Sequence, residues 1–318
     1  MDDFPLTQGA RGMSRASFLR LAAGTAAGLM LAPSSFAAAT TAVAQMQRRR
    51  IPSSGEMLPV IGCGTYRGFD VASASAEYAR LPAVLDALYA AGGSVLDSSP
   101  MYGRAEAVLG ELLASGKRRQ PAFVATKVWT RSRHNGIRQM QDSMRLLGTE
   151  VLDLMQIHNL VDWQTHLATL REWKQAGRIR YLGVTHYTPA AYGELESVMR
   201  AEALDFVQIN YALDDRSAEQ RILPLAAERG VAVLINRPFG GGNLLRRLGG
   251  RALPGWAADI GATSWAQVLL KFVLAHPAVS CAIPGTGNPV HMADNAAAGS
   301  GTIPGPDFWR RRADSIDV

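Results

Sequence analysis

From residue 57 onward, the sequence alternates between short runs of apolar, β-branched residues and longer amphipathic stretches. The short runs predict strands, and the amphipathic stretches have the spacing and length of helices. The expected strands are 60–64, 94–96, 122–126, 152–157, 179–184, 206–209, 231–235 and 279–283. The expected helices are 74–91, 105–115, 137–147, 164–176, 189–199, 218–228, 264–275 and 289–298.

This alternation predicts an α/β fold of the (β/α)8 class, a TIM barrel over residues 45–318. Continuous apolar strands are typical of a parallel sheet that is covered on both faces. Eight strand–helix units in about 250 residues favour a closed barrel over an open doubly wound sheet. No G-x-G-x-x-G motif follows the first strand, and no break in composition divides the chain. Segments 48–51 and 57–58, joined by a turn at 53–55, predict an N-terminal β-hairpin that closes the bottom of the barrel.

Composition excludes several classes of protein. The chain has 318 residues, of which 47% are hydrophobic and 19% charged, so it is neither disordered nor a coiled coil. The formal net charge is +6, but the arginines at 48–50 and 310–312 form only small groups, which favours a solvated basic surface over nucleic-acid binding. No apolar run reaches the roughly 20 residues that a membrane span needs. We expect Cys63 and Cys281 to be buried free thiols, with a disulfide as the alternative in an oxidising compartment.

Residues 1–44 have the order of segments found in secretory signals. Arginines within 11–20 precede an apolar stretch at 21–32, a Pro-Ser-Ser break at 33–35 follows, and Ala-Val-Ala at 42–44 matches an A-x-A cleavage site before Gln45. The apolar stretch is too short to span a bilayer. We therefore expect a signal peptide over 1–44 and a mature barrel over 45–318.

The segment 14–20, SRASFLR, resembles a twin-arginine signal, with Ala16 in the place of the second arginine. This resemblance implies export to the periplasm by the twin-arginine machinery. The alternative is an uncleaved N-terminal extension on a cytoplasmic protein.

Polar residues stand at the ends of three successive predicted strands. Asp97, Lys127 and His158 each follow an apolar run, and barrels of this class place their active sites at these strand ends. Tyr102 follows Asp97 in a turn that contains Pro100. An acid, an amine, an imidazole and a phenol are thus expected at one mouth of the barrel.

These four side chains suit proton transfer to a carbonyl group. An ammonium at Lys127, held charged by Asp97, stabilises a phenolate at Tyr102 and lowers the pKa of the phenol. His158 donates a hydrogen bond to the carbonyl oxygen as negative charge develops there. A hydride has to come from a cofactor, because no side chain supplies one.

Seven ordered segments resemble the aldo-keto reductase family, whose members are NAD(P)H-dependent (β/α)8 barrels. The resemblance spans roughly residues 48 to 300. The segments are LPVIGCGTY (58–66), LDSSPMYGRAE (96–106), FVATKVW (123–129), DLMQIHNLVD (153–162), GRIRYLGVTHY (177–187), VQINYAL (207–213) and IPGTGNP…DN (283–295).

The resemblance implies reversible reduction of an aldehyde or ketone by a catalytic tetrad with Tyr102 as the proton donor. The tetrad is Asp97, Tyr102, Lys127 and His158. The implied cofactor contacts are Thr65, Asp97, Thr185, His186, Gln208, Asn236, Arg237, Phe239, Gly240, Thr286, Gly287, His291, Asp294 and Asn295. Aromatic residues just beyond strand ends predict a substrate pocket formed by Tyr66, Trp129 and Trp163 together with His158.

The sequence departs from the family pattern around the nicotinamide. Thr185-His186 stands where Ser-Asn is usual, and both residues can bond an amide. Asn236 stands where a tyrosine commonly stacks on the nicotinamide, and we expect Tyr211 or Phe239 to compensate.

A second departure concerns the choice of cofactor. Gly285 and His291 occupy positions where NADPH-preferring members usually carry Lys and Arg, and charge-assisted bonds to phosphate are strong. Thr286 and the backbone amides that open the last helix can still bind a phosphate. NADP(H) is the family default, and NAD(H) remains open.

Two functions besides carbonyl reduction remain open at the level of sequence. One is a nicotinamide-binding sensor or partner subunit without catalysis, and the other is an isomerase or lyase that uses Lys127 as a Schiff base. We expect a small-molecule carbonyl substrate, no nucleic-acid partner and a monomer. No metal site is expected, because Gly62-Cys63-Gly64 lacks the H-x-H of a barrel metallohydrolase.

Overall fold

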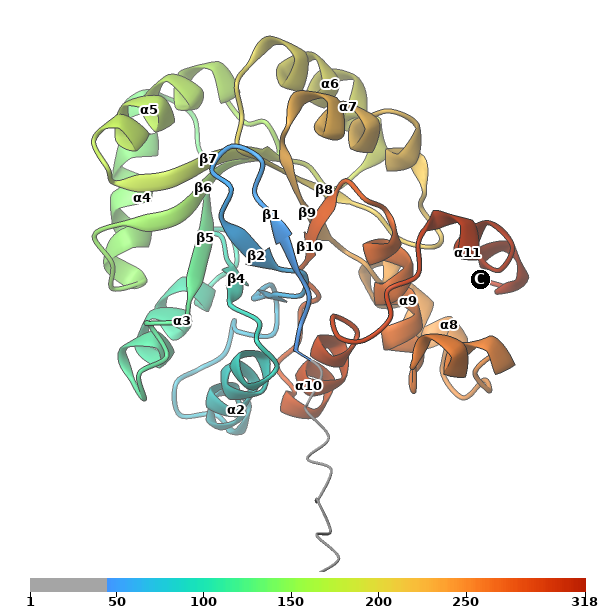
Figure 1. The fold of residues 1–318 in the computed structure, drawn as a ribbon. Helices are drawn as coiled ribbons and strands as arrows, with labels where there is room; N and C mark the ends of the chain where they lie inside the picture. Colours follow the sequence, from blue (N-terminus) through green and yellow to red (C-terminus); the bar gives the residue numbers. More distant parts are fainter. Residues whose placement is uncertain (1–44) are drawn as a thin grey trace, which may run out of the picture. The chain divides into compact units, whose positions relative to one another are not determined.

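A computed structural model describes residues 45–318 of the chain, which form a closed parallel barrel surrounded by helices (Figure 1). Eight strands follow one another in sequence order around the sheet. The ring closes where Ile61 pairs in parallel with Ala282 of the last strand, with backbone hydrogen bonds on either side of this bridge. The strands are β3 Cys63–Gly64, β4 Val95–Asp97, β5 Phe123–Val128, β6 Leu152–His158, β7 Ile179–Thr185, β8 Phe206–Asn210, β9 Ala232–Asn236 and β10 Val279–Ala282.

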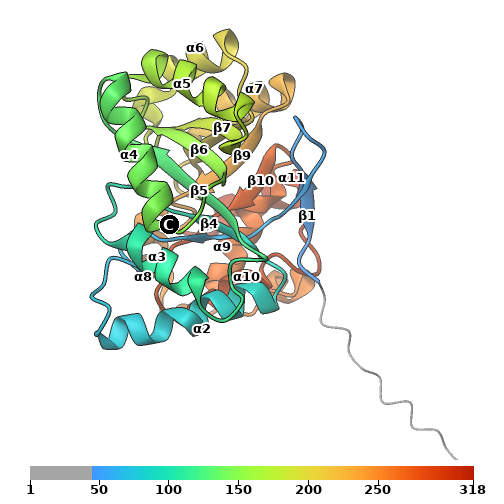
Figure 2. The same ribbon diagram turned by 90° about the vertical axis from the view of Figure 1, so that its left-hand side faces the viewer.

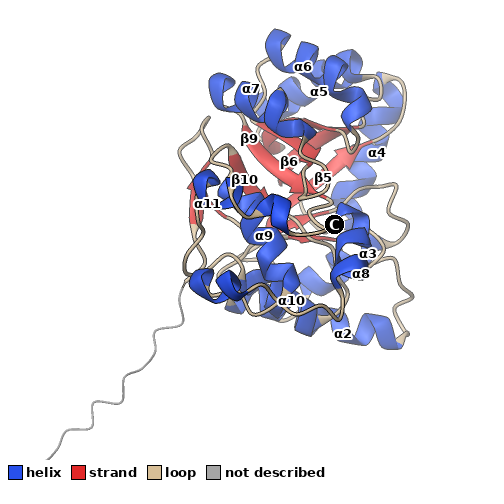
Figure 3. Ribbon diagram, turned by 90° about the vertical axis from the view of Figure 1, so that its right-hand side faces the viewer, coloured by secondary structure: helices blue, strands red, loops and turns tan. Residues whose placement is uncertain are grey.

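Helices cover the outer face of the barrel (Figures 2 and 3). Some of these helices begin at capping signals in the sequence, where the hydroxyls of Ser75, Ser132 and Ser264 each accept a hydrogen bond from a backbone N–H in the first turn. The cap at Ser132 explains why α4 begins before the predicted 137. The principal helices are α2 Ala76–Ala90, α3 Ala105–Ala114, α4 Arg133–Leu146, α5 Trp163–Gln175, α6 Tyr192–Ala201, α7 Ile222–Arg229, α9 Trp265–Ala275 and α10 Pro289–Ala297.

The predicted N-terminal hairpin is present and closes the bottom of the barrel. Strands β1 Arg48–Arg50 and β2 Met57–Pro59 pair antiparallel. Ile51 and Leu58 are buried in the apolar cluster that fills the barrel interior, which also contains Phe123 from β5. The hairpin therefore acts as the apolar floor under the strands.

Four segments differ from expectation. The glycine-rich segment 240–250, whose composition predicts a loop after the seventh barrel strand, is instead a 3-10 turn, η3 Gly240–Gly242, followed by α8 Asn243–Leu248. Glycines in left-handed backbone allow the turn, and burial of Leu244 and Leu248 holds the helix. An unpredicted C-terminal helix, α11 Pro306–Arg310, is held by a buried Trp309. The predicted helices 189–199 and 218–228 each begin as a short 3-10 turn, η1 Pro189–Ala191 and η2 Ser217–Gln220.

Cys63 and Cys281 are both free and buried, as predicted. They belong to different apolar clusters, Cys63 to the one shared with the helices and Cys281 to the barrel interior. No helix in the described part of the chain has the length and apolar character to cross a membrane. The signal segment expected over 1–44 lies outside the described residues.

Candidate active site

A buried layer of polar side chains crosses the barrel at the C-terminal ends of its strands. Asp97 is the centre of this layer. Its Oδ2 accepts a hydrogen bond from Lys127 Nζ at 2.6 Å, and its Oδ1 accepts from the side-chain amides of Gln208 at 2.8 Å and Gln156 at 3.1 Å. Three donors from β5, β6 and β8 thus hold one carboxylate of β4 in place.

Lys127 is completely buried and paired with Asp97. Its ammonium also donates to the carbonyl oxygen of Ser98 at 2.7 Å and lies 5.1 Å from the centroid of the Tyr102 ring. Burial alone lowers the pKa of Lys127, but the charges of Asp97 and the Tyr102 phenolate outweigh it and raise the pKa above its usual value. A positive charge is therefore fixed beside the phenol.

Tyr102 lies in the turn after β4, as predicted. Its backbone N–H donates to the carbonyl of Ser99, and Gly103 follows with φ +59°, where a Cβ would collide with the carboxylate of Asp70. Burial raises the pKa of the Tyr102 phenol above its ordinary value, while Lys127 acts in the opposite direction. The expectation of a lowered pKa is therefore wrong for this structure, because burial outweighs the ammonium.

His158 ends β6 and lies edge-on to Tyr102, with ring centroids 5.9 Å apart. Its Nδ1 is 2.9 Å from the hydroxyl oxygen of the buried Ser99. Burial, followed by the charges of Lys127 and His186, lowers the pKa of His158 to about 3. The imidazole is therefore neutral at pH 7.

Exposed aromatic side chains surround Tyr102 and His158. The ring of Tyr66 is 5.0 Å from that of Tyr102, and the ring of Trp129 is 6.4 Å from that of His158. Both aromatic side chains remain exposed. Trp163, the third aromatic predicted for the pocket, opens α5 and is partly buried against the apolar cluster shared by barrel and helices.

The residues predicted to contact the nicotinamide amide lie next to this layer. Thr185 ends β7, and its hydroxyl lies 3.4 Å from Oε1 of Gln208 on β8. His186 follows, with Nδ1 accepting from the backbone amide of Tyr187 at 3.0 Å. Thr65 is buried, and its hydroxyl donates to Ser98. The structure thus brings Thr185, His186 and Gln208 together, while the Gln208 side-chain nitrogen is already engaged by Asp97.

The end of β9 holds three further predicted contacts. Asn236 donates to the backbone oxygen of His186 at 3.3 Å, and Arg237 is exposed, in left-handed backbone, with its guanidinium 5.7 Å from the centroid of the Tyr187 ring. No ion pair of Arg237 occurs among residues 45–318. Gly240 opens the glycine turn η3.

Both rings proposed to compensate for Asn236 are buried. Tyr211 is buried on the helical side, where its hydroxyl donates to Glu219 and its ring lies 5.5 Å from that of Phe272. Phe239 is packed in the same outer apolar cluster. The stacking hypothesis for Tyr211 is therefore wrong, because its side chain points toward the helices.

The loop between β10 and α10 carries the last group of predicted contacts. Thr286 accepts a hydrogen bond from the backbone of Asn288, and Gly287 lies against Gly68 so closely that a Cβ would be 2.9 Å from its oxygen. His291 is exposed in the first turn of α10. Deeper in α10, Asn295 is buried, and the Asp294 carboxylate accepts from Ser264 and Gln267 of the neighbouring helix.

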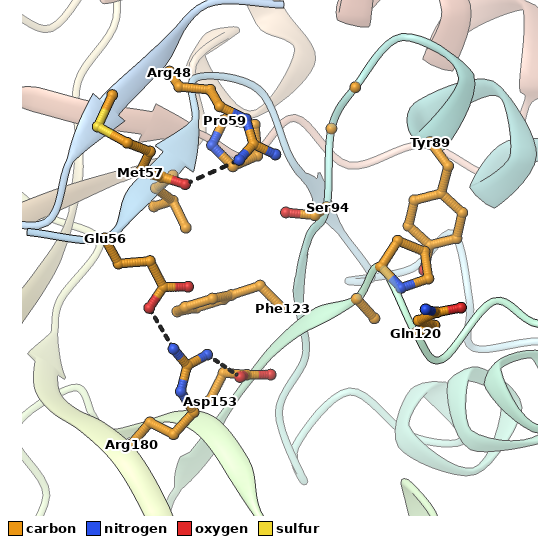
Figure 4. Close-up of a pocket in the computed structure, with 15 residues that line it drawn as sticks. Arg48, Glu56, Met57, Pro59, Tyr89, Ser94, Gln120, Phe123, Asp153 and Arg180 are labelled. Carbon is orange, nitrogen blue, oxygen red and sulfur yellow. Dashed lines mark hydrogen bonds and ion pairs between the residues drawn. The ribbon is translucent and has the colours of Figure 1, made fainter.

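A separate cleft of about 400 Å³ lies at the hairpin end of the barrel (Figure 4). Arg180 binds Glu56 and Asp153 there, with 2.6 Å between Arg180 Nη1 and Asp153 Oδ1. None of the predicted site residues lines this cleft. Residues 45–318 contain no cluster of His, Cys, Asp and Glu that fits a metal ion.

Three residues of the site escaped the sequence reasoning. Gln156 lies two positions before His158 on the same strand, so alternation along β6 places both on the inner face, and that signal was available. Ser98 and Ser99 follow Asp97 in a loop, where no periodicity indicates the direction of a side chain.

Comparison with known proteins links this geometry to one group of enzymes. The sequence pattern described as the aldo/keto reductase family matches residues 60–309. Methylglyoxal reductase YeaE of Escherichia coli is 31% identical over 261 residues, which cover 79% of this chain and 89% of that protein. Pyridoxal 4-dehydrogenase of Microbacterium luteolum is 25% identical over 338 residues, covering 83% and 95%.

Solved structures show the same fold. An aldo-keto reductase from Klebsiella pneumoniae in complex with NADPH superimposes with a TM-score of 0.72 at 25% identity, covering 85% of this chain and 95% of that one. A second Klebsiella pneumoniae aldo/keto reductase structure, with NADP and acetate, has a TM-score of 0.67 at 25% identity and covers 82% and 92%.

Proposed function

The chain belongs to the aldo/keto reductase family, and from this premise we propose that it reduces an aldehyde or ketone to an alcohol with NADPH, reversibly. One observation carries the proposal: Tyr102 lies beside the buried Lys127–Asp97 pair and edge-on to a neutral His158. A proton donor, a fixed positive charge and a neutral hydrogen-bond donor are the groups that carbonyl reduction needs.

Each of the four side chains has a distinct task in this proposal. The phenol of Tyr102 holds the proton that passes to the carbonyl oxygen. Lys127 stabilises the phenolate left behind, and Asp97 keeps Lys127 charged. His158 donates a hydrogen bond to the same oxygen and orients the substrate. In the oxidative direction the phenolate of Tyr102 accepts the proton.

The residues around the mouth fit a nicotinamide dinucleotide. Thr185 and His186 offer neutral hydrogen-bonding groups for an amide, and Arg237, exposed and without an ion pair in the described part, offers a cation for phosphate. When bound, the nicotinamide supplies the hydride to the carbonyl carbon. Thr286 and the first turn of α10 are proposed to hold the 2′-phosphate. NADPH is the proposed cofactor, with NADH accepted because Gly285 and His291 replace the usual basic pair.

Methylglyoxal is the first substrate to test, because the Escherichia coli relative is named for its reduction. The exposed rings of Tyr66 and Trp129 offer apolar walls as well, so aryl aldehydes belong in the same screen. The proposed enzyme acts as a monomer.

We further propose that residues 1–44 are a signal peptide and that the barrel, 45–318, acts in the periplasm after export by the twin-arginine machinery. Support comes from the segment 14–20 and the Ala-Val-Ala at 42–44. Fractionation of cells that express the full chain tests this, and a cytoplasmic, uncleaved product contradicts it.

The decisive experiment on the reaction is Tyr102→Phe. We expect carbonyl-dependent NADPH oxidation to be lost, while titration of tryptophan fluorescence shows unchanged NADPH binding. Tyr89→Phe is a matched control, because the Tyr89 hydroxyl is buried, has no hydrogen-bond partner among the described residues and lies outside the site. Retained turnover in Tyr102→Phe contradicts the assigned role. Cofactor binding without any turnover in the unmodified chain supports a nicotinamide sensor instead.

A further inference from the structure

Ser99 is a buried residue whose hydroxyl touches the site but has no assigned part in the reaction. It lies two residues after β4, in the loop that leads to Tyr102, and is fully buried. Its Oγ is 2.9 Å from Nδ1 of His158. This is the only hydrogen bond that the His158 ring makes within residues 45–318, so Ser99 alone decides how that nitrogen is satisfied.

The direction of this hydrogen bond follows from the other contact of the hydroxyl. The backbone N–H of Met101 points at Ser99 Oγ from 3.4 Å, so the oxygen already serves as an acceptor. In the described part of the chain, Nδ1 of His158 is the only acceptor within reach of the Ser99 proton. Donation from Ser99 to Nδ1 is therefore the arrangement in which both groups are satisfied.

Because the His158 ring is neutral, the direction of this hydrogen bond determines which ring nitrogen carries the proton. Burial and the neighbouring Lys127 and His186 keep His158 neutral, with a pKa of about 3. A neutral imidazole carries one N–H and one acceptor nitrogen. If Nδ1 accepts from Ser99, the single N–H of His158 is on Nε2, the nitrogen without a partner in the described part.

We propose that Ser99 is a positioning residue that fixes His158 as the Nε2–H tautomer and thereby presents an N–H donor to the carbonyl oxygen of the substrate. This inference rests on the proposed carbonyl reduction. The opposite tautomer presents a lone pair to that oxygen, which repels it as negative charge develops. One buried hydroxyl thus determines whether His158 assists or opposes proton transfer from Tyr102.

The first test is a direct measurement on the full-length chain. Two-bond ¹H–¹⁵N correlation spectra of ¹⁵N-histidine-labelled protein at pH 7 distinguish the two tautomers, and His158→Gln assigns the signals among the six histidines. We expect the His158 Nδ1 signal at the shift of an unprotonated nitrogen and Nε2 at that of a protonated one. A protonated Nδ1 in the unmodified chain overturns the proposal, and the measurement needs no substrate.

The second test uses Ser99→Ala. We expect the His158 signals to move toward a mixture of tautomers and the NADPH Kd to stay unchanged. We expect kcat for carbonyl reduction to fall about tenfold, which is a fraction of what a general acid–base group contributes. Ser280→Ala is the matched control, because its buried hydroxyl bonds the backbone of Val233 far from the mouth. Unchanged His158 signals and unchanged kcat in Ser99→Ala contradict the proposal.

The two tests separate this inference from the proposed function. If the unmodified chain shows the Nε2–H tautomer but reduces no carbonyl, the proposed reaction fails, and the inference that rests on it fails with it. If the chain reduces carbonyls with His158 in the Nδ1–H form, only the role of Ser99 is wrong. Ser99→Cys, which keeps a weak donor at the same position, serves as the second variant if Ser99→Ala does not fold.

Discussion

Lys127 Nζ lies 2.6 Å from Asp97 Oδ2, in an ion pair that is buried on both sides. A buried pair is expensive to break, because removing one partner leaves the other charge uncompensated. The amides of Gln156 and Gln208 satisfy the second oxygen of Asp97, so the carboxylate is fixed from both sides. The pair therefore links the stability of the barrel wall to the charge that Tyr102 experiences.

Asp97→Asn tests this link. The variant removes the negative charge that raises the pKa of Lys127, so burial lowers that pKa and the ammonium loses its proton more readily. We expect kcat for carbonyl reduction to fall on the order of 100-fold, within the range that acid–base groups contribute. Steady-state kinetics with NADPH measure it. Glu172→Gln, which breaks the exposed pair with Arg133, is the control and is expected to leave kcat unchanged.

The pH dependence of the reaction follows from two pKa directions. Reduction needs the protonated phenol, and burial raises the pKa of Tyr102 above its ordinary value of about 10. His158, with a pKa of about 3, stays neutral above that pH. Reductive kcat is thus expected to be flat from pH 5 to pH 9, whereas oxidation, which needs the phenolate, accelerates as pH rises. An acidic limb near pH 6.5 that vanishes in His158→Gln contradicts this assignment.

A single substitution is expected to change the preference between NADPH and NADH. His291 is exposed in the first turn of α10, the helix start that is proposed to hold the 2′-phosphate. A cation there gains about 1 kcal/mol with the 2′-phosphate, so His291→Arg is expected to tighten NADPH binding roughly fivefold and leave NADH unchanged. Fluorescence titration with both nucleotides measures the ratio. His134→Arg, an exposed site on α4, is the control for added charge, and an equal gain for NADH is the result that excludes phosphate recognition.

Gln156 provides a test of the buried layer itself. Its amide donates to Asp97 and accepts from Gln208, and its side chain is fully buried. Gln156→Leu removes one acceptor of the Gln208 side-chain N–H and one of the three donors to Asp97. We expect this loss to lower the free energy of unfolding by about 1–3 kcal/mol. Urea denaturation measures the loss, and the exposed Gln175→Leu is the control. A variant as stable as the parent shows that the amide contributes nothing to the layer.

The positions of site residues can be predicted from the sequence where strand periodicity determines the direction of a side chain. Asp97 and His158 end apolar strands of a parallel barrel and Lys127 is the last residue but one of its strand, so their convergence follows from the strand order. Tyr211 follows a strand end as well, yet it faces the helices and donates to Glu219. Successive side chains of an extended chain point in opposite directions, so a residue just past a strand end points away from the last residue of the strand. The family pattern does not indicate this direction for Tyr211.

Loops are the second limit on prediction. The glycines at 240–242 predict a turn, but only burial of Leu244 and Leu248 shows that a helix follows. The contact between Ser99 and His158 joins a loop to a strand 59 positions away. Local propensity carries no information on such a contact, which depends on how the barrel places β4 beside its neighbours.

The hairpin floor offers a test of the fold that is independent of the chemistry. Leu58 is fully buried in the interior cluster with Ile51, Phe123 and Tyr181, while the neighbouring Met57 is exposed. Leu58→Ala removes buried methyl groups and leaves a cavity under the strands, at an expected cost of about 2–5 kcal/mol in unfolding free energy. Met57→Ala, one residue away on the same strand, is expected to stay within about 0.5 kcal/mol.

The comparison of these two variants decides whether the hairpin is part of the barrel core. Because the polar layer lies at the opposite ends of the strands, kcat of folded Leu58→Ala is expected to match the parent at 25 °C. Chemical denaturation with kinetics on the same samples measures both quantities. Equal unfolding free energies for Leu58→Ala and Met57→Ala contradict the role of the hairpin as an apolar floor, since a side chain that fills the barrel interior cannot be removed without loss of packing.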